Sequence, residues 1–268
     1  LHCHTKMSDM DGVSEVKDLV KRAHDWGHKA IAITDHGVVQ AFPDANHYIE
    51  TLDKDDPFKV IYGVEGYLVD DLQDVAVNEK GQSLKGTYVV FDLETTGFSS
   101  AKDKIIEIGA VKVENGEITD KYSTFVNPKI PIPFRITQLT SITDEMVMGS
   151  PEIETILPQF LKFVGDAVLV AHNASFDVSF IEENCRQQGI EPDFTSVDTV
   201  GLARVLLPTL SKFKLNVVAK ALNISQEHHH RAVDDARVTA EIYVKFIQML
   251  EERGIETLDQ MNHFGAHN

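Results

Sequence analysis

Cysteine and long apolar runs are scarce in this chain, and both absences limit what it can be. Its 268 residues include only Cys3 and Cys185, far apart in sequence. They make no disulfide framework, so we expect a reducing compartment, the cytoplasm. No apolar run approaches the roughly 20 residues of a membrane-spanning helix, and no signal-peptide pattern opens the chain. Leu1 rather than Met comes first, which we expect of a piece of a longer protein.

Positive charge is also scarce. The chain has 25 Lys and Arg against 42 Asp and Glu, which gives a formal net charge of −17. A protein that binds nucleic acid unaided usually has the opposite sign. The acidic residues are therefore either a solvated surface or, in part, metal ligands in a protein whose nucleic acid is delivered by another domain. Charge alone does not choose between these two interpretations.

The order of apolar patterns and turn signals predicts two α/β units. Helices at 14–26 and 44–52 alternate with strands at 29–34 and 58–69. Residues 70–86 are polar with two glycines and are interpreted as a linker. The second unit then has strands at 87–94, 104–113, 116–127 and 167–173, and helices at 150–164, 175–188, 197–206, 214–222 and 233–253. A mixed sheet flanked by helices is the economical fold.

Two acids end the apolar strand of the stretch TYVVFDLETTGFSS. Side chains alternate across a strand, so Asp92 and Glu94 point to one face. Two close carboxylates repel, and one takes up a proton unless a cation lies between them. A hard divalent ion such as Mg²⁺ or Mn²⁺ prefers such oxygen ligands. The competing interpretation is a strand that has simply reached solvent.

Two later segments favour the metal. AHNASFD places Asp177 in the first turn of a helix that follows a buried strand. HRAVDDARVTAEIY places His230 just before a helix and Asp235 on its first turns. The apolar pattern of that helix favours Asp235 over its neighbour Asp234 for the site.

The segments DLETTG, HNASFD and HRAVDDA, in this order, resemble the three motifs of the DEDD exonuclease superfamily, in the subclass with a histidine in its third motif. The resemblance covers residues 87–253 and extends to ITQLTSITDEMV, in which Ser141 stands where the family has Gly. It implies a ribonuclease H-like α/β fold with a mixed five-stranded sheet, and a 3′→5′ exonuclease with two Mg²⁺ or Mn²⁺. Asp92, Glu94, Asp177 and Asp235 would be the metal ligands, with His230 as general base.

The resemblance also implies where the substrate lies. Thr95, Thr96 and Gly97 would bring their backbone close to the terminal nucleotide, and Phe98 would either contact a base or lie in the core. The expected partner is a single-stranded or frayed 3′ DNA end. The side chains of Lys102, Lys129, Arg135, Lys212 and Lys214 could touch phosphates, although surface lysines are usually solvated.

The first eighty residues carry a second set of candidate ligands. His2, His4, Asp11, His36 and Glu65 could build a mixed nitrogen and oxygen site for Zn²⁺, Mn²⁺ or Fe, with Asp35 beside them. The segments LHCHTKMSDMDG, ITDHG and GVEG resemble the early motifs of PHP domains, the polymerase-and-histidinol-phosphatase family. The later ligands of that β/α barrel have no match in this chain, so we expect an incomplete PHP segment.

One family combines these parts. The alpha subunits of PolC-type DNA polymerase III from Gram-positive bacteria carry an exonuclease inserted in a PHP domain, and the chain resembles that arrangement. It implies a split PHP domain at 1–82, the exonuclease at 83–253 and a return towards PHP at 254–268, with the rest of the polymerase and the replisome as partners and no membrane. The alternatives are an RNA-trimming exonuclease, a PHP phosphoesterase, and a non-enzymatic structural or partner-binding fragment.

Overall fold

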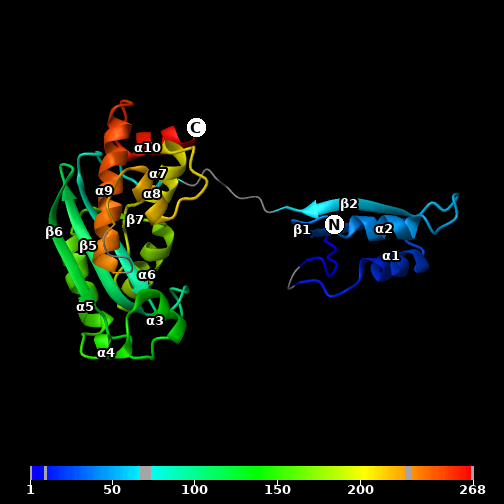
Figure 1. The fold of residues 1–268 in the computed structure, drawn as a ribbon, viewed down its shortest axis with the longest axis horizontal. Helices are drawn as coiled ribbons and strands as arrows, with labels where there is room; N and C mark the ends of the chain where they lie inside the picture. The colour runs from blue at the N-terminus through cyan, green and yellow to red at the C-terminus, as the bar shows by residue number, and fades with distance from the viewer. Residues whose placement is uncertain (1, 9–10, 67–73, 227–230, 267–268) are drawn as a thin grey trace. The chain divides into compact units, whose positions relative to one another are not determined.

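A computed structural model describes residues 2–8, 11–66, 74–226 and 231–266 (Figure 1). The chain forms two compact units, Leu1–Asp71 and Leu72–Asn268, and each is described by itself. Within the described ranges, no helix is both long and apolar enough to cross a bilayer.

The first unit consists of a layer of two strands and a layer of two helices. Its elements are α1 (Val16–Asp25), β1 (Ala30–His36), α2 (Phe42–Ile49) and β2 (Lys59–Glu65). The strands pair in parallel, with Ala30 opposite Lys59 and His36 opposite Glu65, so both strands end together. Val20, Ile33 and Ala45 are buried between the layers. Gly27, at φ 74°, ends α1 in the conformation that favours glycine.

The second unit contains a mixed sheet in the order β3-β8-β7-β4-β5-β6. The strands are β3 (Ala76–Val77), β4 (Thr87–Thr95), β5 (Ile105–Glu114), β6 (Glu117–Phe125), β7 (Val168–Ala171) and β8 (Ser196–Asp198). β4, β5 and β6 are antiparallel neighbours, whereas β7 runs parallel to β4 and to β8. The β5–β6 hairpin turns at Asn115 and Gly116, both at positive φ, as the Asn-Gly pair predicts.

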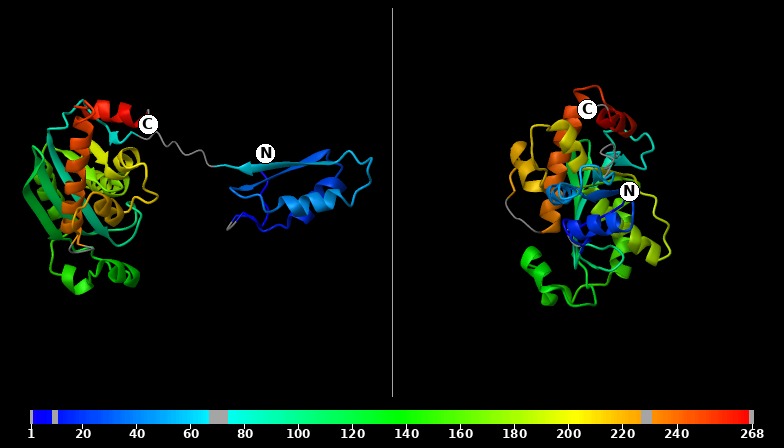
Figure 2. Two further views of the ribbon diagram at one scale, coloured as in Figure 1. Left: turned by 45° about the horizontal axis from the view of Figure 1, so that its top comes forward. Right: turned by 90° about the vertical axis from the view of Figure 1, so that its right-hand side faces the viewer.

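Helices cover both faces of this sheet. They are α3 (Phe134–Thr140), α4 (Asp144–Val147), α5 (Ile153–Val164), α6 (Ala174–Gln187), α7 (Thr199–Leu206), α8 (Leu215–Ala221), α9 (Ala232–Glu251) and α10 (Leu258–Ala266). Figure 2 shows α9, in orange, running along the sheet. The alternation of β4 divides the core: Tyr88 and Val90 pack with α9, whereas Val89 and Phe91 pack with α5 and α6.

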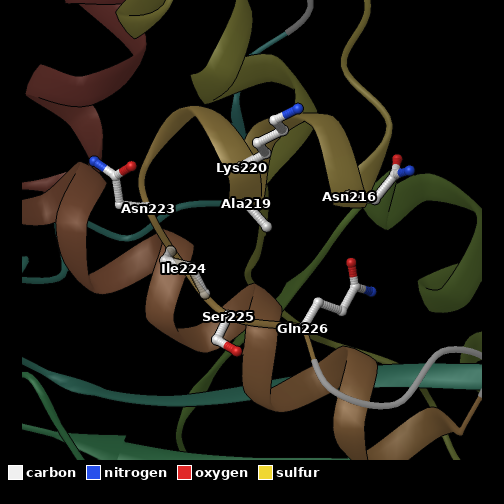
Figure 3. A pocket seen from close by; sticks show the side chains of 7 residues that line it. All are labelled: Asn216, Ala219, Lys220, Asn223, Ile224, Ser225 and Gln226. Atoms are coloured by element: carbon white, nitrogen blue, oxygen red, sulfur yellow. The ribbon is translucent and has the colours of Figure 1, made fainter.

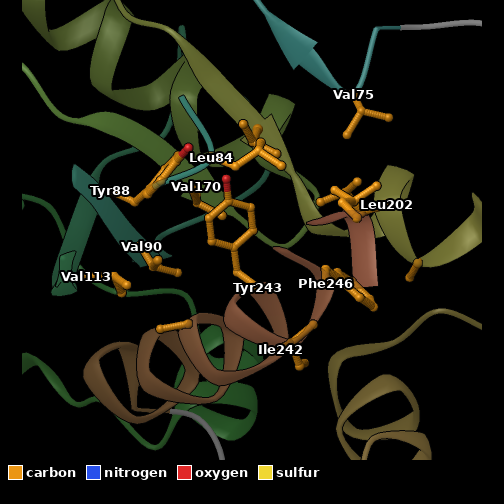
Figure 4. Close-up of a cluster of buried hydrophobic side chains, with 14 of the residues drawn as sticks. Val75, Leu84, Tyr88, Val90, Val113, Val170, Leu202, Ile242, Tyr243 and Phe246 are labelled. Carbon is orange, nitrogen blue, oxygen red and sulfur yellow. The ribbon is translucent and has the colours of Figure 1, made fainter. Parts of the chain in front are cut away.

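The core under α9 joins distant parts of the sequence. Tyr243 points from α9 towards Tyr88 and Val170 of the sheet, and Phe246 lies in the same cluster (Figure 4). All four side chains are buried. The packing of one apolar face, rather than helix propensity, stabilises a helix of this kind. Because Asp92 and Glu94 follow Tyr88 and Val90 at steps of two, they also face α9.

The interpretation of residues 70–86 as a linker is wrong for the part that the structure describes, 74–86. Ala76 pairs with Val197 in the sheet, and Asn262 of α10 bonds both the N–H and the carbonyl of Ala76. Leu84 is buried in the core under α9. The segment looks like a linker because its side chains are polar, but backbone pairing fixes it. It adds a sixth strand to the expected five.

Other differences concern short elements. Strand β8 occupies the start of the helix expected at 197–206, which begins two residues later, at Thr199. Helices α3, α4 and α10 were not expected from the sequence. Cys185 is buried in the core cluster that contains α5 and α6 residues, where it acts as a small apolar side chain.

The start of α9 rests directly on Gly109 of β5. A Cβ at Gly109 would lie 2.0 Å from the backbone nitrogen of Val233. We expect Gly109→Ala to destabilise the chain by about 2 kcal/mol, because the helix has to move off the sheet. Urea unfolding followed by circular dichroism measures this change.

Gly149→Ala is the matched control, because no atom lies within 4 Å of its added Cβ. Its unfolding free energy should change by no more than about 0.5 kcal/mol. Equal effects of the two substitutions would show that α9 does not press on β5.

Candidate metal centres

Three carboxylates meet at the end of β4. Asp92 and Glu94 leave the strand on the face that α9 covers, and Asp235 lies in the first turn of α9. One oxygen from each of the three lies within 4.8 Å of the other two. The strand and the helix that position them also form the core under α9, so the carboxylates are held on rigid elements.

Asp177 joins this group from the other layer. It lies in the first turn of α6, which follows β7 after a turn at Asn173, and its side chain is only 3% exposed. Its Oδ1 accepts a hydrogen bond from the N–H of Leu93, the residue between Asp92 and Glu94, at 3.1 Å. The structure therefore brings together all four carboxylates expected from the sequence.

The burial of these acids is electrostatically costly. Burial, followed by the charge of Asp177, raises the pKa of Asp92 well above its usual value. Burial is also the main cause of the raised pKa of Asp177. Burial, then the charges of Glu107 and Asp235, raises the pKa of Glu94 to about 7. A divalent cation removes this repulsion, and the all-oxygen donor set suits a hard metal ion.

Glu107 is a buried acid that the sequence analysis missed. It lies on β5 opposite Glu94 and is 1% exposed. Its Oε1 accepts two hydrogen bonds from the Arg231 guanidinium, at 2.9 and 3.0 Å, and its Oε2 accepts the N–H of Ala232 at 3.2 Å. Glu107 and Gly109 thus fix the start of α9, and with it Asp235. A lone acid inside the apolar run IIEIGAV was the available signal.

Asp198 was missed as well. It ends β8 and caps α7, with Oδ1 accepting the N–H of Val200 at 3.0 Å. The same Oδ1 accepts the N–H groups of Asn173 and Ala174, at 2.8 and 3.2 Å. One carboxylate therefore satisfies the N-terminal donors of two helices, α7 and the α6 that carries Asp177. An Asp directly before a helix predicts the first cap, but not the second.

The loop after Glu94 is closed by its own hydrogen bonds. The Thr95 hydroxyl donates to the Gly97 carbonyl at 2.6 Å, and the Thr96 hydroxyl accepts the N–H of Lys104 at 2.9 Å. Both threonines are buried. Gly97 lies against Asp103, whose carboxylate would be 2.5 Å from an added Cβ. These three residues therefore shape the loop.

Phe98 is the exposed member of the loop, at 67%. Its ring centroid lies 6.4 Å from that of Phe176, the residue before Asp177. The Arg135 guanidinium lies 5.6 Å from the Phe98 ring centroid. An aromatic face beside the carboxylates can stack against a base.

His230 and its neighbours His228 and His229 lie outside the residues that the structure describes. The next described residue is Arg231, whose guanidinium donates hydrogen bonds to Glu107. His172 is partly buried, and burial lowers its pKa. Its Nε2 donates to the Phe213 carbonyl at 2.7 Å, and its Nδ1 lies 2.8 Å from the Thr199 hydroxyl.

The first unit brings its five candidate ligands together where β1 and β2 end. Glu65 Oε2 lies 2.8 Å from His2 Nδ1 and 2.8 Å from His4 Nε2. Asp11 Oδ2 lies within hydrogen-bond distance of His4 Nδ1 and 3.1 Å from His36 Nε2. Two groups suited to a metal result, His2/His4/Glu65 and His4/Asp11/His36, and they share His4.

The charges of this cluster complement one another, in contrast to the carboxylate group. The hydrogen bond to Glu65 raises the pKa of His4. The hydrogen bond to His4 lowers the pKa of Asp11 and of Glu65. Asp35 takes a different part: it is buried and accepts the N–H and hydroxyl of Thr5, at 2.6 and 2.8 Å, and the hydroxyl of Ser8, at 2.8 Å. It therefore holds the loop that follows His4.

Known proteins match both units. The exonuclease family model RNase_T matches residues 89–243, and the PHP domain model matches residues 1–127. The chain is 56% identical over 263 residues to the PolC-type DNA polymerase III of Clostridium perfringens. It is 50% identical over 262 residues to that of Caldanaerobacter subterraneus. Each match covers 98% of this chain, and the chain spans 18% of the length of each relative.

Among solved structures, Exonuclease X in complex with 5′-overhanging duplex DNA is 29% identical, with a TM-score of 0.53. The match covers 66% of this chain and 99% of that one. These findings confirm the exonuclease, PHP and PolC-type resemblances and the ribonuclease H-like fold class that the motifs indicate.

We expect Glu94→Gln to stabilise the metal-free chain at pH 8 by on the order of 2 kcal/mol. Folding raises the pKa of the Glu94 carboxyl from 4.5 to about 7. The folded chain therefore loses stability as the pH rises through this range, because the group must ionise in a buried site. The gain should vanish near pH 5, where the wild-type group holds its proton. Urea unfolding in EDTA at the two pH values measures it.

Glu114→Gln on the same sheet is the control, since Glu114 is exposed at the far end of β5. It should have no pH-dependent effect on the unfolding free energy. A Glu94→Gln gain that is equal at both pH values would contradict the electrostatic account.

Proposed function

The chain belongs to the RNase_T exonuclease family, and we propose that it is the proofreading 3′→5′ exonuclease segment of a replicative DNA polymerase. It would hydrolyse the 3′-terminal phosphodiester of a single-stranded or frayed DNA end and release nucleoside monophosphates. The observation that carries the proposal is the meeting of Asp92, Glu94 and Asp235, whose oxygens lie within 4.8 Å, with Asp177 bonded to the intervening Leu93.

The donor set fits two divalent metal ions, Mg²⁺ or Mn²⁺. All four side chains offer carboxylate oxygens, and the raised pKa values of Asp92, Glu94 and Asp177 are typical of a site built around positive charge. Bound metal ions lower the pKa of a coordinated water and stabilise the charge that develops on phosphate and leaving oxygens. Asp92, Glu94, Asp177 and Asp235 would hold them, positioned by β4, α6 and α9.

The other residues of the chain would bind the substrate and move a proton. The closed loop of Thr95, Thr96 and Gly97 presents backbone beside Glu94, and Phe98 offers its exposed ring to the terminal base. We assign the proton transfer from the attacking water to His230, because its reference pKa of about 6.5 suits a base near neutral pH. Arg231, held by Glu107, fixes the chain directly after it.

The polymerase context comes from the relatives, whose names give PolC-type DNA polymerase III. We propose that residues 1–82 contribute the front of a split PHP domain, 83–253 the exonuclease, and 254–268 the way back towards PHP. Strand β3 and helix α10, which lie in the first and last of these ranges, pack with the exonuclease unit. The five ligands of the first unit would join a PHP metal site for Zn²⁺ or Mn²⁺ when that domain is whole. A bacterial replicative polymerase acts in the cytoplasm, with the replisome as partner.

We expect Asp92→Ala to reduce exonuclease activity at least about a thousandfold, because a metal ligand that stabilises charge in the transition state contributes several kcal/mol. The assay is the shortening of a 5′-labelled single-stranded DNA oligomer with Mg²⁺ or Mn²⁺. Wild type should give a ladder that shortens from the 3′ end.

Asp120→Ala, an exposed acid on β6, is the control and should retain wild-type activity. A folded wild-type chain that leaves the 3′ end intact, or equal ladders from wild type and Asp92→Ala, would contradict the proposal. An RNA oligomer of the same sequence, run beside the DNA, decides whether the substrate is DNA or RNA.

A further inference from the structure

A long stretch of the sequence has no acidic residue at all. From residue 199 to 226 the only charged side chains are four cations, in a chain whose formal net charge is −17. These cations are Arg204, Lys212, Lys214 and Lys220. The stretch contains α7, α8 and the segment after α8. Positive groups that follow a surface are the feature by which proteins bind a nucleic-acid backbone.

An open hollow of about 540 Å³ lies along α8. Among the described residues, its lining contains no Asp or Glu. Five polar side chains contribute to it, from Asn216, Lys220, Asn223, Ser225 and Gln226 (Figure 3). Figure 3 shows Asn216 and Gln226 on one side, Asn223 on the other, and Lys220 above them on α8. We call this hollow the α8 groove.

The groove reaches the carboxylate site through Gln226. The Nε2 of Gln226 donates a hydrogen bond to Asp235 Oδ1 at 3.1 Å. Its Oε1 is buried and has no hydrogen-bond partner among the residues that the structure describes. A buried carbonyl without a donor costs free energy, and a donor on a bound ligand, such as a base N–H, would remove that cost.

The other end of the segment is also tied to the site. The carbonyl of Phe213, directly before Lys214, accepts the hydrogen bond from His172 Nε2. His172 lies between β7 and the helix α6 that carries Asp177. The two ends of 213–226 are therefore hydrogen-bonded to the two parts of the fold that supply Asp177 and Asp235.

We infer that the α8 groove binds the single strand of nucleic acid directly upstream of the nucleotide that is cleaved. The ammonium groups of Lys214 and Lys220 pair with backbone phosphates, and the amides of Asn216, Asn223 and Gln226 bond sugar and base atoms. This inference rests on the proposed function, because it takes the phosphodiester at the carboxylates as the reference point. It gives an acidic chain a local cationic path for its polyanionic substrate.

The test measures binding separately from chemistry. A labelled oligothymidine is titrated with the 268-residue chain in EDTA, and fluorescence anisotropy is recorded at several salt concentrations. The variant is Lys214→Gln with Lys220→Gln. The control is Lys121→Gln with Lys162→Gln. These exposed lysines lie on β6 and α5, and their substitution removes the same amount of charge far from the groove.

We expect the groove variant to bind about tenfold more weakly at low salt, and its log–log salt slope to be shallower by about 1.4, or 0.7 for each phosphate contact on a single strand. The control should keep the wild-type slope. All four lysines are exposed, and circular dichroism checks that both variants fold.

Hydrolysis of the p-nitrophenyl ester of thymidine 5′-monophosphate with Mn²⁺ tests the proposed function independently. If wild type hydrolyses the ester but groove and control variants bind DNA equally, the groove inference is wrong and the function stands. If wild type hydrolyses neither the ester nor DNA, the proposed function fails and the inference fails with it. If the wild type hydrolyses the ester and only the groove variant loses DNA binding, the result supports both the proposed function and the groove inference.

Discussion

The burial of like charges at the end of one strand is the constraint on which the second unit depends. β4 carries its apolar residues to the middle of a six-stranded sheet and then places Asp92 and Glu94 on the face that α9 covers. Asp177 and Asp235 are added from α6 and α9. Burial and mutual repulsion raise the pKa values of Asp92, Glu94 and Asp177, which favours their protonated forms when no positive charge is nearby. The fold thus keeps mutually repelling acids close together at a place where bound metal ions would offset the repulsion.

Two other acids, Glu107 and Asp198, help to position the carboxylates of the site. Glu107 and Asp198 lie close to the site, but donors satisfy both: Arg231 and Ala232 for Glu107, and the first N–H groups of α6 and α7 for Asp198. Their charges hold the starts of α9 and α6, and these helix starts carry Asp235 and Asp177. Two satisfied carboxylates thus determine where two of the four site carboxylates lie.

Local sequence patterns predicted most of the fold and the candidate site. The features that they missed depend on contacts between residues far apart in the sequence. Apolar runs predicted β4 and β5, the Asn115-Gly116 pair predicted the hairpin, and three short motifs predicted all four carboxylates. The strand β3 could not be predicted, because its two residues are apolar neighbours in a polar segment and are fixed by pairing with β8. Glu107 and Gln226 were missed for the same reason: their partners lie far along the chain or depend on how α8 and α9 pack.

Asp92, Glu94 and Asp177, whose pKa values are raised, are expected to hold protons that metal binding at the carboxylate site displaces. Calorimetric titration with Mn²⁺ near pH 7, in two buffers of different ionisation enthalpy, measures the protons released on binding. Wild type should release more protons than an Asp92→Asn, Asp177→Asn double variant, and the cluster of the first unit contributes equally to both. Equal proton release from the two proteins would contradict the account, because the carboxylates would then be fully ionised before metal binds.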